Sequence, residues 1–161
     1  MSMRKERPRN RNKSFRPKTD EKKIRDIIQE IDDKLKDSIQ PQIVEGLNSF
    51  ERRLIHRHYD HNPDVETRTY RRAGSFTLYV YPVANIENFA REKARQVLEQ
   101  GESIDLPPMG SFERYIVHNC LKEIDGVETI SFGEGRERHV QIINKKFGRG
   151  LKKIVKKIKL F

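Results

Sequence analysis

A stretch of eight residues occurs twice in this chain, 62 positions apart and without a gap. Residues 49–56 read SFERRLIH, and residues 111–118 read SFERYIVH. The same offset aligns Val-Glu-Thr at 65–67 with Val-Glu-Thr at 127–129, which gives eight identities in nineteen aligned positions. Self-similarity at one fixed offset indicates a duplicated unit of roughly 60 residues. Because two copies are too few for a solenoid, we expect two small units in tandem.

Each octapeptide is predicted to begin a helix. Asn48 or Ser49 in the first copy, and Ser111 in the second, can accept free backbone N–H bonds as N-caps. Glu51 and Glu113 then fall in the first turn, where the helix dipole favours a negative charge. Apolar residues that recur at helical spacing are expected to be buried. They are Phe50, Leu54, Ile55 and Tyr59 in the first copy, and Phe112, Ile116, Val117, Cys120, Leu121 and Ile124 in the second.

An arginine and a histidine lie four positions apart in both copies. The pairs are Arg52 with His56, and Arg114 with His118. Residues at this spacing lie on one side of a helix, so a cation and a titratable ring are held together twice. The arrangement suits a phosphate group and its neighbouring base. The alternative is structural, with the histidine bonded to a neighbouring group and the arginine paired with an acid.

These residues carry a resemblance to a known family. Arginine, three residues and histidine on a helix, followed by a Val-Glu-Thr strand and a glycine-containing turn, resembles the R-3-H domain. The second copy is the closer match, because residues 106–109, residues 131–135 and Arg138 also resemble the C-terminal domain of bacterial Jag-type RNA-binding proteins. The resemblance covers residues 86–144 well and residues 22–83 loosely. It implies single-stranded nucleic-acid binding by a small α+β domain, without a cofactor.

The resemblance and the Arg/His pairs together define the candidate nucleic-acid contacts. They are Arg114, His118, Lys122, Arg136 and Arg138 in the second copy, and Arg52 and His56 in the first. The first copy departs from the family pattern, because residues 71–74 read RRAG and Phe76 aligns with Arg138. We therefore expect the first copy to serve mainly as a structural partner of the second.

The charge of the chain is concentrated at its two ends. Residues 1–18 hold eight Lys or Arg and one acid, and residues 145–161 hold eight Lys or Arg and no acid. The whole chain carries +10, so the 126 residues between these arms sum to −5. Such basic blocks are typical of disordered arms that bind nucleic acid, and the alternative is a pair of solubilising tails. Residues 150–158 have an apolar face among lysines, which also fits an anionic membrane surface.

The remaining patterns predict the same order of elements in both units. In the first unit we expect a helix from Thr19 or Asp20, a short edge strand at 42–45, the motif helix at 48–60 and a hairpin of 65–70 with 76–81. In the second we expect a helix capped by Asn85 and ended by Gly101, a strand at 103–106, the motif helix at 110–124 and a hairpin of 127–132 with 138–143. Tyr79 and Tyr81 fall on the sheet face away from the apolar side, where they either pack across strands or stack on bases.

These expectations give an α+β fold of two tandem units, each with helices on one face of a small, mainly antiparallel sheet and with disordered basic arms outside them. The predicted boundaries are 1–18 for the first arm, 19–83 for a degenerate R-3-H-like unit, 84–144 for the second unit and 145–161 for a basic amphipathic tail. The single cysteine, Cys120, suits a reducing bacterial cytoplasm. No run of roughly 20 apolar residues is present to span a membrane.

The predicted function is that of a non-catalytic protein that binds single-stranded RNA. Catalytic chemistry is not expected, since no Gly-rich phosphate loop or paired carboxylates occur and no base aligns with Cys120. His56, His58 and His61 lack a fourth ligand for zinc, so no metal is expected. The second interpretation is a factor that docks on a ribonucleoprotein such as the ribosome with its arms threaded into RNA. The third is a DNA-binding protein, and a membrane-surface role through residues 150–161 also stays open; no small-molecule substrate is expected.

Overall fold

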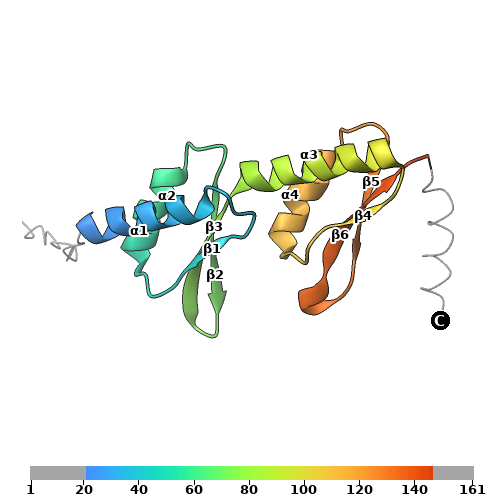
Figure 1. Ribbon diagram of the computed structural model, residues 1–161. Helices are drawn as coiled ribbons and strands as arrows, with labels where there is room; N and C mark the ends of the chain where they lie inside the picture. The colour runs from blue at the N-terminus through green and yellow to red at the C-terminus, as the bar shows by residue number, and fades with distance from the viewer. Residues whose placement is uncertain (1–20, 147–161) are drawn as a thin grey trace, which may run out of the picture.

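The computed structural model describes residues 21–146, so both predicted basic arms, apart from Lys145 and Lys146, lie outside the described residues. The first unit comprises α1 (Glu21–Leu35), β1 (Gln42–Val44), α2 (Ser49–Tyr59), β2 (Glu66–Arg72) and β3 (Ser75–Tyr81). The second unit comprises α3 (Val83–Gln100), β4 (Ile104–Asp105), α4 (Ser111–Leu121), β5 (Val127–Phe132), a short 3-10 turn η1 (Gly135–Glu137) and β6 (His139–Asn144). The two units lie side by side (Figure 1). The predicted α+β fold is confirmed.

The two units share one sheet topology. Each has three antiparallel strands, in the order β1-β3-β2 in the first and β4-β6-β5 in the second. The hairpin β2–β3 and the hairpin β5–β6 both extend toward the lower edge of Figure 1. The repeat in the sequence is therefore matched by a repeat in the order and pairing of the elements.

Each sheet buries one face against its helices. In the first unit the helices contribute Ile24, Ile31 and Ile55, which pack on Leu78 and Val80 of β3. In the second unit α3 and α4 cover Val140 and Ile142 of β6, mainly through Ala90, Ala94, Val97, Ile116, Val117 and Leu121. Successive strand residues point to opposite faces, so Tyr79 and Tyr81 lie on the face away from the helices, as predicted.

The starts of the two motif helices differ from each other. Asn48 caps α2, because its side-chain oxygen accepts the N–H groups of Phe50 and Glu51, each at 2.9 Å. The helix α4 begins after Gly110, and Ser111 is its first residue. The prediction of Ser111 as a cap was therefore wrong by one position. Phe50 was also expected in the core, but its side chain is 40% exposed because α2 turns it away from the sheet.

Two boundaries of the second unit were predicted inaccurately. The helix α4 ends at Leu121 rather than 124, since the Leu121 carbonyl accepts the Ile124 N–H in a tight i→i+3 turn at 3.1 Å. The helix α3 begins at Val83, and Asn85 lies inside its first turn rather than at its cap. The Asn85 side chain instead donates to the carbonyls of Leu35 at 2.6 Å and Ser38 at 3.0 Å, beyond the end of α1. Gly101 ends α3 in the left-handed conformation, as predicted.

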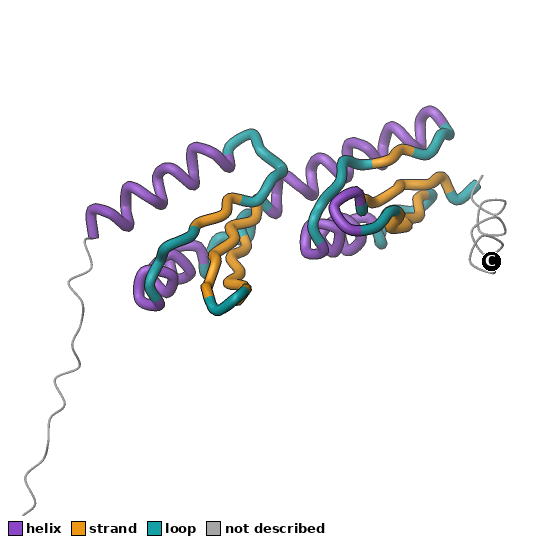
Figure 2. Tube along the Cα trace, turned by 90° about the horizontal axis from the view of Figure 1, so that it is seen from below, coloured by secondary structure: helices purple, strands orange, loops and turns teal. Residues whose placement is uncertain are grey.

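The two units are joined closely, with only Pro82 between β3 and α3. Ile39 of the first unit packs against the core of the second. Across the same junction the ring of Tyr81 meets the ring of Phe112 edge-on, with 4.7 Å between centroids. Seen from below, α1 and α3 follow one another along one side of the molecule (Figure 2). This junction sets the relative position of the two hairpins.

Candidate nucleic-acid interface

The Arg/His pair of α4 is held by contacts within the second unit. Arg114 donates from Nη1 to the Met109 carbonyl at 2.7 Å. His118 uses both ring nitrogens, with Nδ1 2.7 Å from the Thr129 hydroxyl and Nε2 2.8 Å from the Ser131 hydroxyl. The histidine therefore hydrogen-bonds α4 to β5. The arginine hydrogen-bonds the start of α4 to the loop before it.

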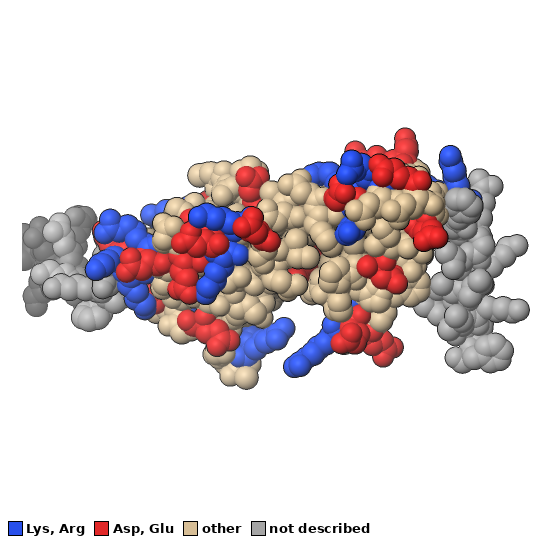
Figure 3. Space-filling view, viewed as in Figure 1, with Lys and Arg blue, Asp and Glu red and all other residues tan. Residues whose placement is uncertain are grey.

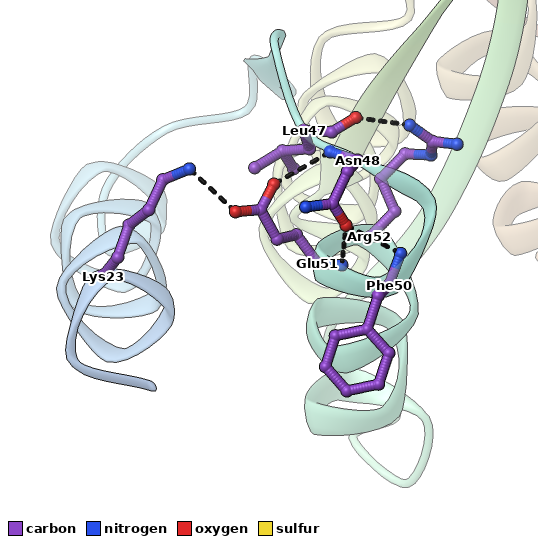
Figure 4. Close-up of polar contacts among 6 residues, drawn as sticks. All are labelled: Lys23, Leu47, Asn48, Phe50, Glu51 and Arg52. Carbon is purple, nitrogen blue, oxygen red and sulfur yellow. Dashed lines mark hydrogen bonds and ion pairs between the residues drawn. The ribbon is translucent and has the colours of Figure 1, made fainter. Parts of the chain in front are cut away.

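The first unit repeats this arrangement at the same offset of 62 residues. Arg52 donates to the Leu47 carbonyl at 2.5 Å, which Figure 4 shows beside the start of α2. His56 contacts the hydroxyls of Thr67 at 2.6 Å and Thr69 at 2.9 Å. The duplicated motif therefore preserves a structural brace between the motif helix and the next strand.

Both histidines are kept in their neutral form. Burial, and secondly the neighbouring arginine, lower the pKa of His56 and of His118 below the usual value. A neutral ring has one donor and one acceptor nitrogen, and each nitrogen faces a hydroxyl that can play the opposite role. Neither ring supplies a positive charge for a phosphate in this arrangement, so their predicted contact with nucleic acid remains a prediction.

A buried glutamate also stabilises the start of each motif helix. Glu51 accepts the Asn48 N–H at 2.8 Å, and Glu113 accepts the Gly110 N–H at 2.8 Å. Lys23 of α1 also reaches Glu51 at 2.8 Å, as Figure 4 shows, and this hydrogen bond lowers the pKa of the carboxyl. For Glu113 burial dominates and raises the pKa. Both carboxylates hold the helix start, and they do not face an open site.

The exposed cations of the second unit lie beside this brace. Met109 connects them, because its carbonyl accepts from Arg114 while its N–H donates to the Arg138 carbonyl at 3.1 Å. Arg136 and Arg138 are exposed, and within residues 21–146 neither guanidinium has a hydrogen-bond or ion-pair partner. The structure therefore brings Arg114 close to the backbone of Arg138 through Met109, and Arg136 lies two residues before Arg138 in the chain.

Lys122 lies apart from that group. It follows the last residue of α4, eight residues after Arg114, which is about 12 Å along a helix. Its ammonium group donates to Asn119 at 3.0 Å and lies 4.0 Å from Glu123. In the first unit, Phe76 stands where the second has Arg138, and the Arg52 guanidinium lies over its ring at 4.8 Å. An arginine–aromatic contact thus replaces the exposed cation.

The helix-free face of the first sheet carries a set of residues that the sequence did not single out as a group. The pairing of Arg68 with Tyr79, and of Tyr70 with Thr77, places these side chains on one face. The rings continue onto α4 in an unbroken row from Tyr70 through Tyr79, Tyr81 and Phe112 to Tyr115. Only Tyr79 and Tyr81 could be flagged from strand alternation, because the rest of the row depends on how the units meet.

Charged residues lie at the ends of both hairpins. Figure 3 shows Lys or Arg side chains there, on either side of the gap between the two units, and Asp or Glu side chains beside them in the second unit. The arginines of these segments are Arg71 and Arg72 in β2, and Arg136 and Arg138 after β5.

In the described part of the chain, no group of three or more His, Cys, Asp or Glu is placed to hold a metal ion. No helix within 21–146 is long and apolar enough to cross a bilayer.

The second unit is similar in sequence to known proteins. Residues 84–144 match the family model of the R-3-H domain. The chain is 36% identical over 87 residues to the RNA-binding protein KhpB of Bacillus subtilis, which covers 53% of this chain and 38% of that protein. It is 35% identical over 57 residues to the RNA-binding protein KhpB of Streptococcus pneumoniae, which covers 35% of this chain and 17% of that protein. The chain thus spans well under half the length of these relatives. Residues 84–144 are an R-3-H domain.

Proposed function

We propose that the protein binds single-stranded RNA without catalysing a reaction, and that the R-3-H domain makes the directed contacts. The observation that carries the proposal is the pair of exposed guanidinium groups of Arg136 and Arg138, which have no hydrogen-bond or ion-pair partner within residues 21–146. Arg138 is also joined through Met109 to Arg114. Planar guanidinium groups are suited to phosphate, whereas both arginines of α3, Arg91 and Arg95, form ion pairs with glutamates. The RNA-binding relatives share this part of the chain.

The basic arms supply sequence-independent affinity in this proposal. Residues 1–18 and 145–161 carry +7 and +8, whereas the body between them is slightly acidic. Charges of this kind release counterions from a nucleic acid and strengthen binding to every sequence alike. We place the protein in the cytoplasm, where its single cysteine stays reduced. The first unit acts as the structural partner that positions the R-3-H domain.

The test compares two double variants of the full chain on one single-stranded RNA oligomer. Arg136→Gln with Arg138→Gln should weaken binding about tenfold at 0.15 M salt and reduce the slope of log K against log salt by about 1.4, as expected for two lost phosphate contacts on a single strand. The control, Arg91→Gln with Arg95→Gln, removes the same charge from arginines paired with Glu87 and Glu92. It should bind like the wild type.

A second arm of the experiment tests the form of the nucleic acid. Single-stranded RNA should bind more tightly than a duplex of equal length, because exposed bases are available only in the single strand. If the Arg136/Arg138 variant bound as tightly as the control, the R-3-H domain would not be the contact surface. A ribonucleoprotein-docking factor whose arms carry the RNA contacts would then be the better description.

A further inference from the structure

The contact region between the two units, which we call the seam, has the features of a base-stacking surface. It is the region where Tyr81 of β3 meets Phe112 of α4. Five rings follow one another across it, at centroid distances of 5.1, 6.0, 4.7 and 5.9 Å. They are Tyr70, Tyr79 and Tyr81 from the first unit, and Phe112 and Tyr115 from the second. We call this set the aromatic row. Tyr79 with Tyr81 and Phe112 with Tyr115 are stacked, whereas the other two contacts are edge-on. Tyr81 is buried in the middle of the row, so the ring most open to a base is Tyr115.

A hollow opens on this row. It has a volume of about 370 Å³ and is lined by Arg68, Tyr70, Ser111, Phe112 and Tyr115. This volume is within the range of small-molecule sites in proteins. Both units contribute to the lining, with Arg68 and Tyr70 from β2 and the other three from α4, so neither unit alone contains the hollow.

The charge at the hollow favours an anionic, ring-containing occupant. The Arg68 guanidinium lies 3.6 Å from the centroid of the Phe112 ring, which extends the flat surface with a cation. Glu66 forms an ion pair with Arg68, with 3.5 Å between Oε1 and Nε, but it is not part of the lining of the hollow. Lys or Arg side chains also lie on both sides of the gap between the two units (Figure 3).

The repeat shows that this surface is specific to the seam. Tyr115 occupies the position that Arg53 holds in the first copy, where the two octapeptides first differ. Tyr115 is 59% exposed, the most exposed large hydrophobic side chain in the described part of the chain. A tyrosine that only closed the junction would be covered by the other unit. Tyr115 stacks on Phe112 with an interplanar angle of 16° and leaves its outer face open.

We propose that the aromatic row is a second contact surface for a single-stranded nucleic acid, and that bases stack on Tyr115 and in the hollow beside it. This proposal rests on the proposed function and deepens it, because it assigns the phosphates to the hairpin arginines and the bases to the seam. Stacking tolerates any base, since every base has a π face. The two-unit body then binds one strand along both units, which gives the first unit a role in binding.

The experiment measures binding of the full chain to two probes of equal length, oligouridylate and the same sugar-phosphate strand without bases. Tyr115→Ala should weaken binding to oligouridylate by roughly 5- to 100-fold, the range of one lost base-stacking contact. It should leave binding to the abasic strand unchanged, because the phosphate contacts remain. Tyr115→Phe keeps the ring and should bind both probes like the wild type.

Phe50→Ala is the matched control. Phe50 aligns with Phe112 in the repeat and is exposed like Tyr115, but no other ring contacts it within residues 21–146. It should bind both probes like the wild type. Thermal melting of each variant checks the fold, and Tyr115→Leu replaces Tyr115→Ala if the alanine variant does not fold.

The outcomes separate this proposal from the one it rests on. Failure of the wild type to bind either probe would overturn the proposed function. Wild-type binding with no effect of Tyr115→Ala would overturn only the stacking surface, and it would leave the seam as a packing or protein-docking face. Equal weakening for both probes would also overturn it, because the loss would then not involve bases. A selective loss on oligouridylate, rescued by Tyr115→Phe, is the result that the proposal requires.

Discussion

At the scale of single residues, the Arg/His motif has a structural role, because its side chains hydrogen-bond to neighbouring elements. Each histidine joins its helix to two hydroxyls of the next strand, and each arginine joins the helix start to the preceding loop. A half-buried hydrogen-bonded ring must lose these bonds or desolvate a charge when it is protonated. The folded state therefore prefers both histidines neutral.

This preference predicts a loss of stability in mild acid. Burial lowers the pKa of His56 and His118 in the folded protein, whereas in the unfolded chain it stays near about 6.5. The unfolded chain then binds more protons as the pH falls below about 6.5, so the free energy of unfolding is fully present above that pH and decreases below it. Thermal unfolding at a series of pH values from about 7.5 to 5.5 measures the decrease.

The matched variant for this measurement is His56→Gln with His118→Gln. Glutamine can bond one hydroxyl but does not titrate, so the variant should be less stable at pH 7.5 by about 1–3 kcal/mol per position and should depend less on pH. The two nearby carboxyls do not cause this loss. The pKa of Glu51 is lowered, so its carboxylate stays ionised to lower pH than an ordinary glutamate. Burial raises the pKa of Glu113, so its protonation favours the folded state in acid, opposite in sign to the histidines. An unchanged pH slope in the variant would show that other groups cause the acid sensitivity.

At the scale of elements, the start of α3 organises the junction between the units. The last carbonyls of a helix lack partners within that helix. The Asn85 side chain donates to the carbonyl of Leu35, the last residue of α1, and to that of Ser38 after it. One amide of α3 therefore joins the first helices of the two units. The direct succession of β3, Pro82 and α3 leaves no flexible linker at this point.

Replacement of Asn85 should therefore destabilise the whole body. Asn85→Ala removes the side-chain donor of the Leu35 and Ser38 carbonyls, and within residues 21–146 the Leu35 carbonyl keeps only the longer bond from the Ser38 N–H at 3.4 Å. The free energy of unfolding should therefore fall by about 1–3 kcal/mol. Chemical denaturation of the full chain measures the change. Gln96→Ala is the control, because Gln96 lies on the same helix and its side-chain bonds within residues 21–146 are to Lys93 and Glu92 of α3 itself. Equal effects of the two variants would argue against a tie between the units.

At the scale of the whole molecule, the two units complete each other. A unit of about 60 residues buries only about 60% of the surface of its unfolded chain and is marginal on its own. In this structure Ile39 adds to the core of the R-3-H domain, and Tyr81 covers the ring of Phe112. The first unit thus shields apolar surface that the R-3-H domain would otherwise expose.

The R-3-H domain alone should consequently melt below the two-unit body. We expect residues 84–146 to lose about 2 kcal/mol relative to residues 21–146, which corresponds to a midpoint lower by roughly 8–16 °C for a domain of this size. Differential scanning calorimetry of the two fragments compares them directly. Identical midpoints would mean that the units fold independently and that the seam contributes nothing to stability.

Much of this architecture was readable from local signals in the sequence. The apolar stripe from Ile24 to Leu35 and the alternation from Phe76 to Tyr81 depend on neighbours within one element, so they predicted α1 and β3 correctly. The caps were less reliable, because Ser111 and Asn85 both have side chains that suit a helix start. Which polar side chain caps a helix depends on the residue at which the helix begins. Asn85 instead donates to carbonyls that lie 47 and 50 residues away in the sequence.

By itself, the sequence determined the duplication, the α+β class, the edge strand β1 and the positions of the Arg/His pairs, since each follows from spacing along the chain. Only the tertiary structure decided what those side chains do. It placed Thr129 and Ser131 against His118, joined Arg114 to Arg138 through Met109, and set Lys122 apart at the far end of α4. It also assembled the aromatic row from two units. Contacts between residues distant in sequence depend on how elements pack, and no local pattern records that packing.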